Sequence, residues 1–149
     1  MSCRTARILR LDARRGCTTS LVDEDRQQLR NLSQRLIPLH LLLLERERRV
    51  YEERNGAVGS RELLHLLLHD AHFAWLRPLS TLMAEIDAMV DADDPDVPFD
   101  AARMLRRTHQ LLKSGDRGAF QDKYREALQD SPDLVMAHAS VSELLRRAG

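Results

Sequence analysis

The sequence is poor in aromatic residues, cysteine, glycine and proline, and it has no long apolar run. Aromatics make up 4% of the 149 residues against 43% for apolar residues as a whole, and leucine dominates the apolar set. Because β-branched residues are scarce as well, the composition favours helix over strand. A chain of this length is large enough to bury a core as one domain. We therefore expect a globular, all-α protein.

Three further absences exclude classes of protein. The two cysteines, Cys3 and Cys17, both stand near the N-terminus, and they predict neither a disulfide framework nor a cysteine-based metal site. No apolar run reaches the roughly 18 residues that a membrane-spanning helix needs. The N-terminus also lacks the apolar centre of a secretory signal. We expect a cytoplasmic protein that does not associate with a membrane.

Charge is balanced overall but unevenly placed. The chain has 23 basic and 23 acidic residues, so it has no basic field over the whole molecule that would attract nucleic acid. The arginines of residues 1–20 are Arg4, Arg7, Arg10, Arg14 and Arg15. We interpret residues 1–20 as a basic, flexible tail, since untied termini are usually disordered. The alternatives are a contact arm for an anionic partner and an Arg-rich targeting peptide.

Hydrophobic periodicity predicts the helices and their order. A heptad-like leucine stripe indicates a long first helix that starts at Ser20, because Gly16 and residues 18–20 interrupt any earlier helix. It contains Pro38 and ends at Asn55-Gly56. The predicted helices span about residues 20–54, 61–69, 71–90, 101–113, 116–128 and 132–148. The sequence thus predicts a helical bundle of about four longer helices and two short ones, forming a single domain over residues 21–149.

Two of these helices carry specific expectations about burial. The helix Arg61–His69, capped by Ser60, is apolar on nearly every side, so it must be buried in its own core or against another subunit. The charged residues 45–54 at the end of the first helix form opposite-charge pairs three or four apart, which are typical of a solvated surface.

Three segments carry a family resemblance: LIPLH at 36–40, GSRELL at 59–64, and FAWLRPLS at 73–80 after Asp70. They resemble a family of small bacterial all-helical proteins of unknown function, over about residues 21–149. Members often carry proline after the aspartate, where this chain has Ala71. The resemblance implies a helical bundle and a helix boundary at Asp70, and it implies no activity.

The candidate metal ligands are His65, His69 and Glu62. The two histidines are four residues apart and share a helix face, as zinc ligands on a helix do, and Glu62 completes a Glu-x-x-His unit typical of di-iron bundles. One such unit is too few for a di-iron site, and Glu62 also suits the helix dipole. His72 would extend this face only if the helix ran unbroken through Asp70. His40, His109 and His138 lie on or near the apolar faces of three other helices, and a bundle would bring one of them inward toward His65. Isolated histidines of this kind are more often packed neutral imidazoles.

Two other features have a structural and a functional interpretation. Trp75 is expected in the core, although with Arg77 it would also suit a pocket for an anionic or aromatic ligand.

The acidic run at residues 91–96 lacks the glycine and glutamate of a calcium-binding EF-hand loop. We interpret it as a solvated helix exit, which would also attract the basic tail within one chain or across a dimer.

These observations give three ranked hypotheses. The first is a non-enzymatic interaction or regulatory domain that self-associates as a homo-oligomer, because one chain is too small to bury both the leucine stripe and the helix Arg61–His69. The second is a metal-binding bundle for Zn, Fe or Mn that uses Glu62, His65 and His69. The third is contact with nucleic acid through the tail. No residue carries a catalytic signature.

Overall fold

The fold is all-α, as predicted. The computed structural model describes residues 9–94, 96–113 and 115–149, with side chains from Ser20 onward. In these residues it contains helices α1 (Leu9–Asn55), α2 (Ser60–His69), α3 (Arg77–Asp91), α4 (Ala101–Lys113), α5 (Ala119–Asp130) and α6 (Pro132–Ala148), with a 3-10 turn η1 (Ala74–Leu76) before α3. None of these helices combines the length and the apolarity needed to cross a membrane.

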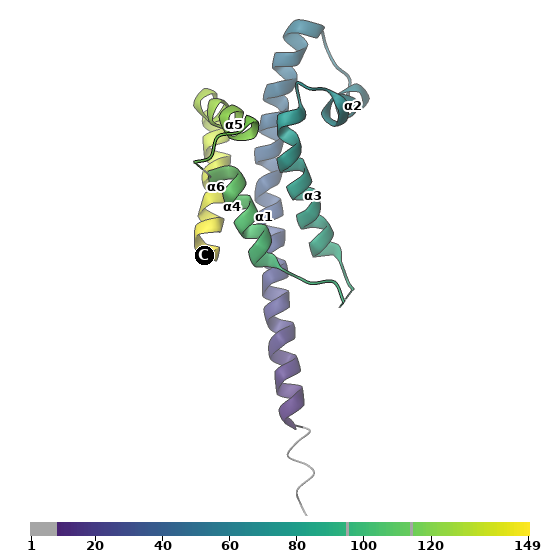
Figure 1. Cartoon of the computed structure of the whole chain (residues 1–149), viewed down its shortest axis with the longest axis vertical. Helices are drawn as coiled ribbons and strands as arrows, with labels where there is room; N and C mark the ends of the chain where they lie inside the picture. The colour runs from purple at the N-terminus through teal and green to yellow at the C-terminus, as the bar shows by residue number, and fades with distance from the viewer. Residues whose placement is uncertain (1–8, 95, 114) are drawn as a thin grey trace, which may run out of the picture.

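Helix α1 is the element on which the bundle is built. It spans 47 residues, or about 70 Å at 1.5 Å per residue. Figure 1 shows it running the length of the molecule, with α3 along one side and α4 and α6 along the other. The predicted stripe forms the centre of the core, since the side chains of Leu29, Leu32, Leu36, Leu39 and Leu43 are all fully buried. Arg35 also ties α1 to α6, since its Nη1 donates to the carbonyl of Ser140 at 2.7 Å.

The predicted start of α1 at Ser20 is wrong. The helix begins at Leu9 and continues through Gly16 and residues 18–20, so Ser20 lies inside it and caps nothing. A single glycine costs a helix only about 1 kcal/mol relative to alanine, which does not end a long helix. The predicted tail therefore overlaps α1 from Leu9 onward, and its residues 1–8 lie outside the described residues. The predicted end of α1 is correct: Gly56 follows Asn55 with a φ of 85°, a left-handed conformation that suits glycine.

The helix boundary expected at Asp70 is confirmed. Asp70 follows α2 with an extended backbone, and its Oδ1 accepts a hydrogen bond from the backbone N–H of His72 at 2.8 Å. Helix α3 starts later than predicted, at Arg77, because η1 precedes it. Pro78 consequently lies in the first turn of α3. In the first turn of a helix the N–H that proline lacks would have no partner within the helix, so proline costs nothing there.

Helix α2 is not buried in the core of its own chain, which was one of the two forms of burial predicted for it. No residue of α2 is buried, and Ser60 does not cap it with its side chain. Three leucines are half-buried against the core, namely Leu63, Leu66 and Leu67. Leu64 and Leu68, on the other side, are 58% and 60% exposed. An apolar helix thus lies on the surface of the bundle with one face uncovered.

The last two helices complete the bundle. Ser131 caps α6, since its side chain accepts a hydrogen bond from the N–H of Leu134. Helix α5 starts at Ala119, three residues after the predicted Asp116. Its Phe120 and Tyr124 are buried and their rings stack with centroids 5.3 Å apart.

Candidate functional site

The most unusual polar residue in the described chain is Glu47, on the inner face of α1. Its side chain is 1% exposed, although the charged stretch around it was predicted to be a solvated surface. Glu47 stands four residues after Leu43, so it continues the leucine stripe toward the core rather than facing water. A buried carboxylate is stable only with partners that offset its desolvation.

Arg46 and His72 are those partners, and they approach the two carboxylate oxygens separately. Arg46 Nη1 donates to Glu47 Oε1 at 2.7 Å. His72 Nε2 lies 3.2 Å from Oε2 and 3.1 Å from the backbone carbonyl oxygen of Glu47. Oε2 thus lies within ion-pair distance of His72 Nε2, but it accepts no well-aligned hydrogen bond. Both groups that face Nε2 are acceptors, so we assign the proton of a neutral His72 to Nε2.

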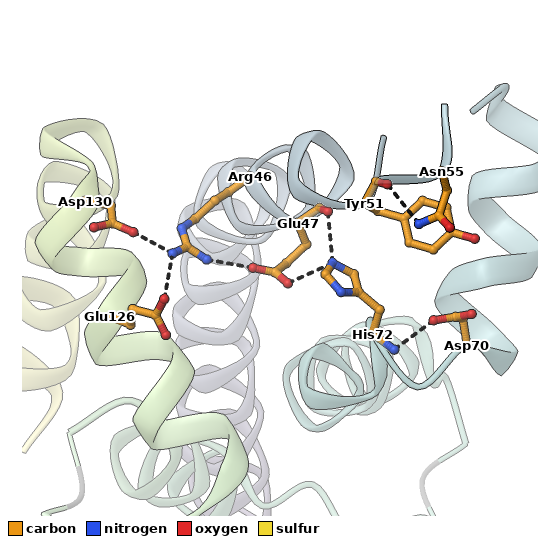
Figure 2. Close-up of polar contacts among 8 residues, drawn as sticks. All are labelled: Arg46, Glu47, Tyr51, Asn55, Asp70, His72, Glu126 and Asp130. Carbon is orange, nitrogen blue, oxygen red and sulfur yellow. Dashed lines mark hydrogen bonds and ion pairs between the residues drawn. The ribbon is translucent and has the colours of Figure 1, made fainter. Parts of the chain in front are cut away.

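Figure 2 shows that this network joins three parts of the molecule. Arg46 reaches from α1 across to α5, where its Nη2 donates to Asp130 at 2.5 Å and to Glu126 at 3.4 Å. Burial alone lowers the pKa of Arg46, but its hydrogen bonds to Asp130 and Glu47 outweigh that effect and raise the pKa above its ordinary value. The arginine is therefore a fixed positive charge between acidic groups on two helices.

His72 is positioned by its neighbours on both sides. Its backbone is held by Asp70, and its ring packs edge-on against Phe73 at a centroid distance of 4.9 Å. The ring of Tyr51, one turn after Glu47 on α1, lies 5.7 Å away. The contact thus fixes the segment between α2 and η1 against α1. In the described chain, the network's charged groups bind one another, and this arrangement suits stabilisation of the fold.

Arg77 anchors the C-terminal end of α2. Its Nε and Nη2 donate to the carbonyls of Leu67 and Asp70, at 3.3 and 3.1 Å, and carbonyls at a helix C-terminus have no partner within the helix. This is a different role from the anion pocket considered from the sequence. Trp75 is buried as expected, beside Phe120 at 5.7 Å, although its indole N–H has no hydrogen-bond partner among the described residues.

The structure places the predicted metal ligands together on the exposed face of α2. Glu62, His65 and His69 are all exposed, and the two imidazole rings lie with centroids 4.7 Å apart. The structure does not bring a third ligand to them from within the chain: over the described residues there is no group of three or more His, Cys, Asp or Glu side chains arranged to hold a metal. Metal binding by these residues stays a prediction.

The remaining histidines do not turn toward His65. His40 pairs with Ser80 at 2.8 Å, between α1 and α3. His138 lies between Tyr124 and Ser142, at 2.8 and 3.2 Å. His109 is exposed on α4. His40 and His138 are thus packed imidazoles, as the structural interpretation expected.

The acidic run is a helix exit, with one basic partner that the sequence did not suggest. Arg26 of α1 donates to the carbonyls of Val90 and Ala92 at the end of α3, and its guanidinium lies 5.1 Å from the centroid of the Phe99 ring. This contact offsets the unfavourable acidic charge at the C-terminus of α3. Contact between the basic tail and nucleic acid stays a prediction.

The buried network was missed because residue type and charge alone do not separate Glu47 from the glutamates around it. The available signal was the stripe itself, which puts position 47 on the buried face. In comparisons with family models, curated proteins and solved structures, nothing matches this chain.

Proposed function

We propose that this protein is a non-enzymatic helical interaction module that self-associates through the outer face of α2. The observation that carries the proposal is the exposure of Leu64 and Leu68 on a helix with no buried residue. These leucines are four apart and therefore lie on one face. Burying a leucine side chain is worth about 1.5–3 kcal/mol, so covering both would contribute substantially to an association free energy.

The face is held in place rather than loosely attached. Its opposite side packs on the core through three leucines, and Arg77 binds the C-terminal carbonyls of α2. The Glu47–His72 contact fixes the chain that follows. A rigid apolar face loses little conformational entropy on binding, which favours association.

The chemistry of the face suits a second copy of the same chain. In a twofold interface the same patch of both copies faces itself, so a face that carries one sign of charge would meet like charge. Residues 63–69 contain no Asp, Glu, Lys or Arg, so such repulsion is absent from the centre of the helix. A second exposed apolar pair, Ile37 and Leu41, lies on α1 at 46% and 56% exposure.

The test is the molar mass of the full chain as a function of concentration, by light scattering or sedimentation. We expect a concentration-dependent dimer, and we expect the variant Leu64→Glu/Leu68→Glu to be monomeric with an unchanged circular dichroism spectrum. The matched control is Val135→Glu/Met136→Glu, an exposed apolar pair on α6 at 47% and 71%. A wild-type protein that stays monomeric at high concentration would contradict the proposal, as would equal loss of the dimer in both variants.

A further inference from the structure

His65 and His69 lie beside Leu64 and Leu68 on the exposed side of α2, the face proposed for self-association. The half-buried residues of α2 are Leu63, Leu66 and Leu67, so the residues on the opposite side of the helix point to solvent. At 100° per residue, the exposed residues of that outward side follow one another around the helix in the order Leu64, Leu68, Arg61, His65, His69 and Glu62.

The two imidazoles have the spacing of ligands on one metal ion. Zinc binds histidine nitrogen at about 2.0–2.1 Å with tetrahedral angles, which puts the ring centroids of two ligating imidazoles roughly 5 Å apart. The centroids of His65 and His69 are 4.7 Å apart, and the rings are tilted by 55°. A small change in side-chain rotamers of two exposed residues is enough to bring both nitrogens to one ion.

One copy supplies only half of a site. Zinc takes four ligands in structural sites, and the described residues offer no third ligand beside this pair. A twofold contact through the outer face of α2 would bring the same pair from a second copy to the opposite side of the ion. Four imidazoles in tetrahedral arrangement are a ligand set that suits Zn²⁺.

We propose that His65 and His69 of two copies together bind one Zn²⁺ ion at the centre of the dimer. The inference rests on the proposed function, because the site is incomplete without the second copy. Glu62 stands three residues before His65 on the same face, where its carboxylate suits the second ring nitrogen of a ligating imidazole. Zinc binding at the interface would strengthen dimerisation by mass action.

The experiment uses the full chain, purified in chelator and then titrated with zinc chloride alone. Calorimetry should give one zinc ion per two chains, and sedimentation should show the dimer dissociation constant falling by about tenfold or more when zinc is present. Cobalt(II) in place of zinc should give the visible absorption of a tetrahedral site. Replacement of both ligands, His65→Ala/His69→Ala, should abolish all three effects.

The matched control is His109→Ala, which removes an exposed histidine from α4 and should leave zinc binding unchanged. One zinc ion per monomeric chain would overturn the inference, because the site would then be completed within one copy. Zinc binding that survives His65→Ala/His69→Ala would overturn it as well.

The same measurements separate this inference from the proposed function. A dimer that forms in chelator, is lost in Leu64→Glu/Leu68→Glu and does not respond to zinc would leave the proposed function standing and refute the zinc site. A zinc-dependent dimer that tolerates Leu64→Glu/Leu68→Glu would support the zinc site and refute the apolar contact. A chain that stays monomeric with and without zinc would refute both.

Discussion

His72 contacts Glu47 at two atoms, with Nε2 3.1 Å from the backbone carbonyl and 3.2 Å from Oε2. One imidazole therefore satisfies a carbonyl of α1 and approaches the buried carboxylate on the same residue. The contact holds the segment that follows α2 against α1. The adjacent residue, Phe73, holds the same segment by an apolar contact, because its side chain is buried in the core.

Removing Glu47 is expected to destabilise the protein. Glu47→Ala leaves a buried gap and deprives Arg46 and His72 of a partner, so we expect the free energy of unfolding to fall by about 1–3 kcal/mol. The loss stays below the roughly 3–5 kcal/mol of an isolated buried pair, because Arg46 retains Asp130. Urea unfolding measures the change. The control is Glu45→Ala, an exposed glutamate two residues earlier, with an expected change within about 0.5 kcal/mol. Equal effects of the two substitutions would refute a special role for the network.

Stability should fall as the pH drops below neutral. Burial lowers the pKa of His40, and burial together with the charge of Lys113 lowers the pKa of His138, from the ordinary value of 6.5. Below that value the unfolded chain binds protons that the folded chain does not, so the free energy of unfolding decreases. The midpoints of urea unfolding, measured at several pH values from neutral to below 6.5, give the dependence of stability on pH.

The matched variant for this pH dependence is His138→Gln, which removes one titrating group and keeps polar atoms near Tyr124. Its stability should depend less steeply on pH than that of the wild type. A slope that is unchanged in both His138→Gln and His40→Gln would show that the dependence comes from other groups.

Tyr124 should remain protonated in the folded protein under alkaline conditions. Burial raises its pKa above the ordinary tyrosine range, and its hydroxyl lies 2.8 Å from His138 Nδ1. A raised pKa in the folded state means stability that is present below the unfolded pKa of about 10 and is lost as the pH rises further. The ultraviolet absorbance of tyrosinate, followed during alkaline unfolding, should therefore include a component absent from Tyr124→Phe. That variant should also lose about 1 kcal/mol at neutral pH.

Gly56 should be costly to replace although it touches nothing. A Cβ at this position meets no atom within 4 Å, so the cost of Gly56→Ala comes from its φ of 85° alone. That conformation costs an L-residue about 1–2 kcal/mol. Gly59→Ala is the control, since Gly59 has an open environment and an extended φ of −73°. Thermal unfolding should show a lower midpoint for the first variant and no decrease for the second.

The fold was predictable from the sequence because its periodic signals are strong. The leucine stripe of the first helix became the centre of the core, from Leu29 to Leu43. The helices predicted over residues 101–113 and 132–148 are present with those bounds. Helix starts were less predictable. Gly16 suggested a break that α1 overrides, and the segment before Arg77 formed a 3-10 turn that periodicity does not distinguish from a helix.

The candidate site was predictable only in part. The spacing of His65 and His69 was enough to place them side by side, because four residues is close to one helical turn. The pairing of Glu47 with His72 was not predictable, because it depends on how the chain after α2 returns to α1. Contacts between residues far apart in the sequence cannot be inferred from the spacing of neighbouring residues.

The tie between Arg35 and Ser140 spans 105 residues of sequence, and it has a consequence for the order of folding. Helix α1 is synthesised before α6, which covers one side of its leucine stripe, and the other described helices lie between them in the chain. Contacts between such distant segments slow folding, because closing the long loop between them costs conformational entropy before the contacts form. During synthesis that side of the stripe therefore stays uncovered until α6 has been made. A nascent chain at that stage presents a long apolar surface of the kind that chaperones bind and that aggregates when unprotected.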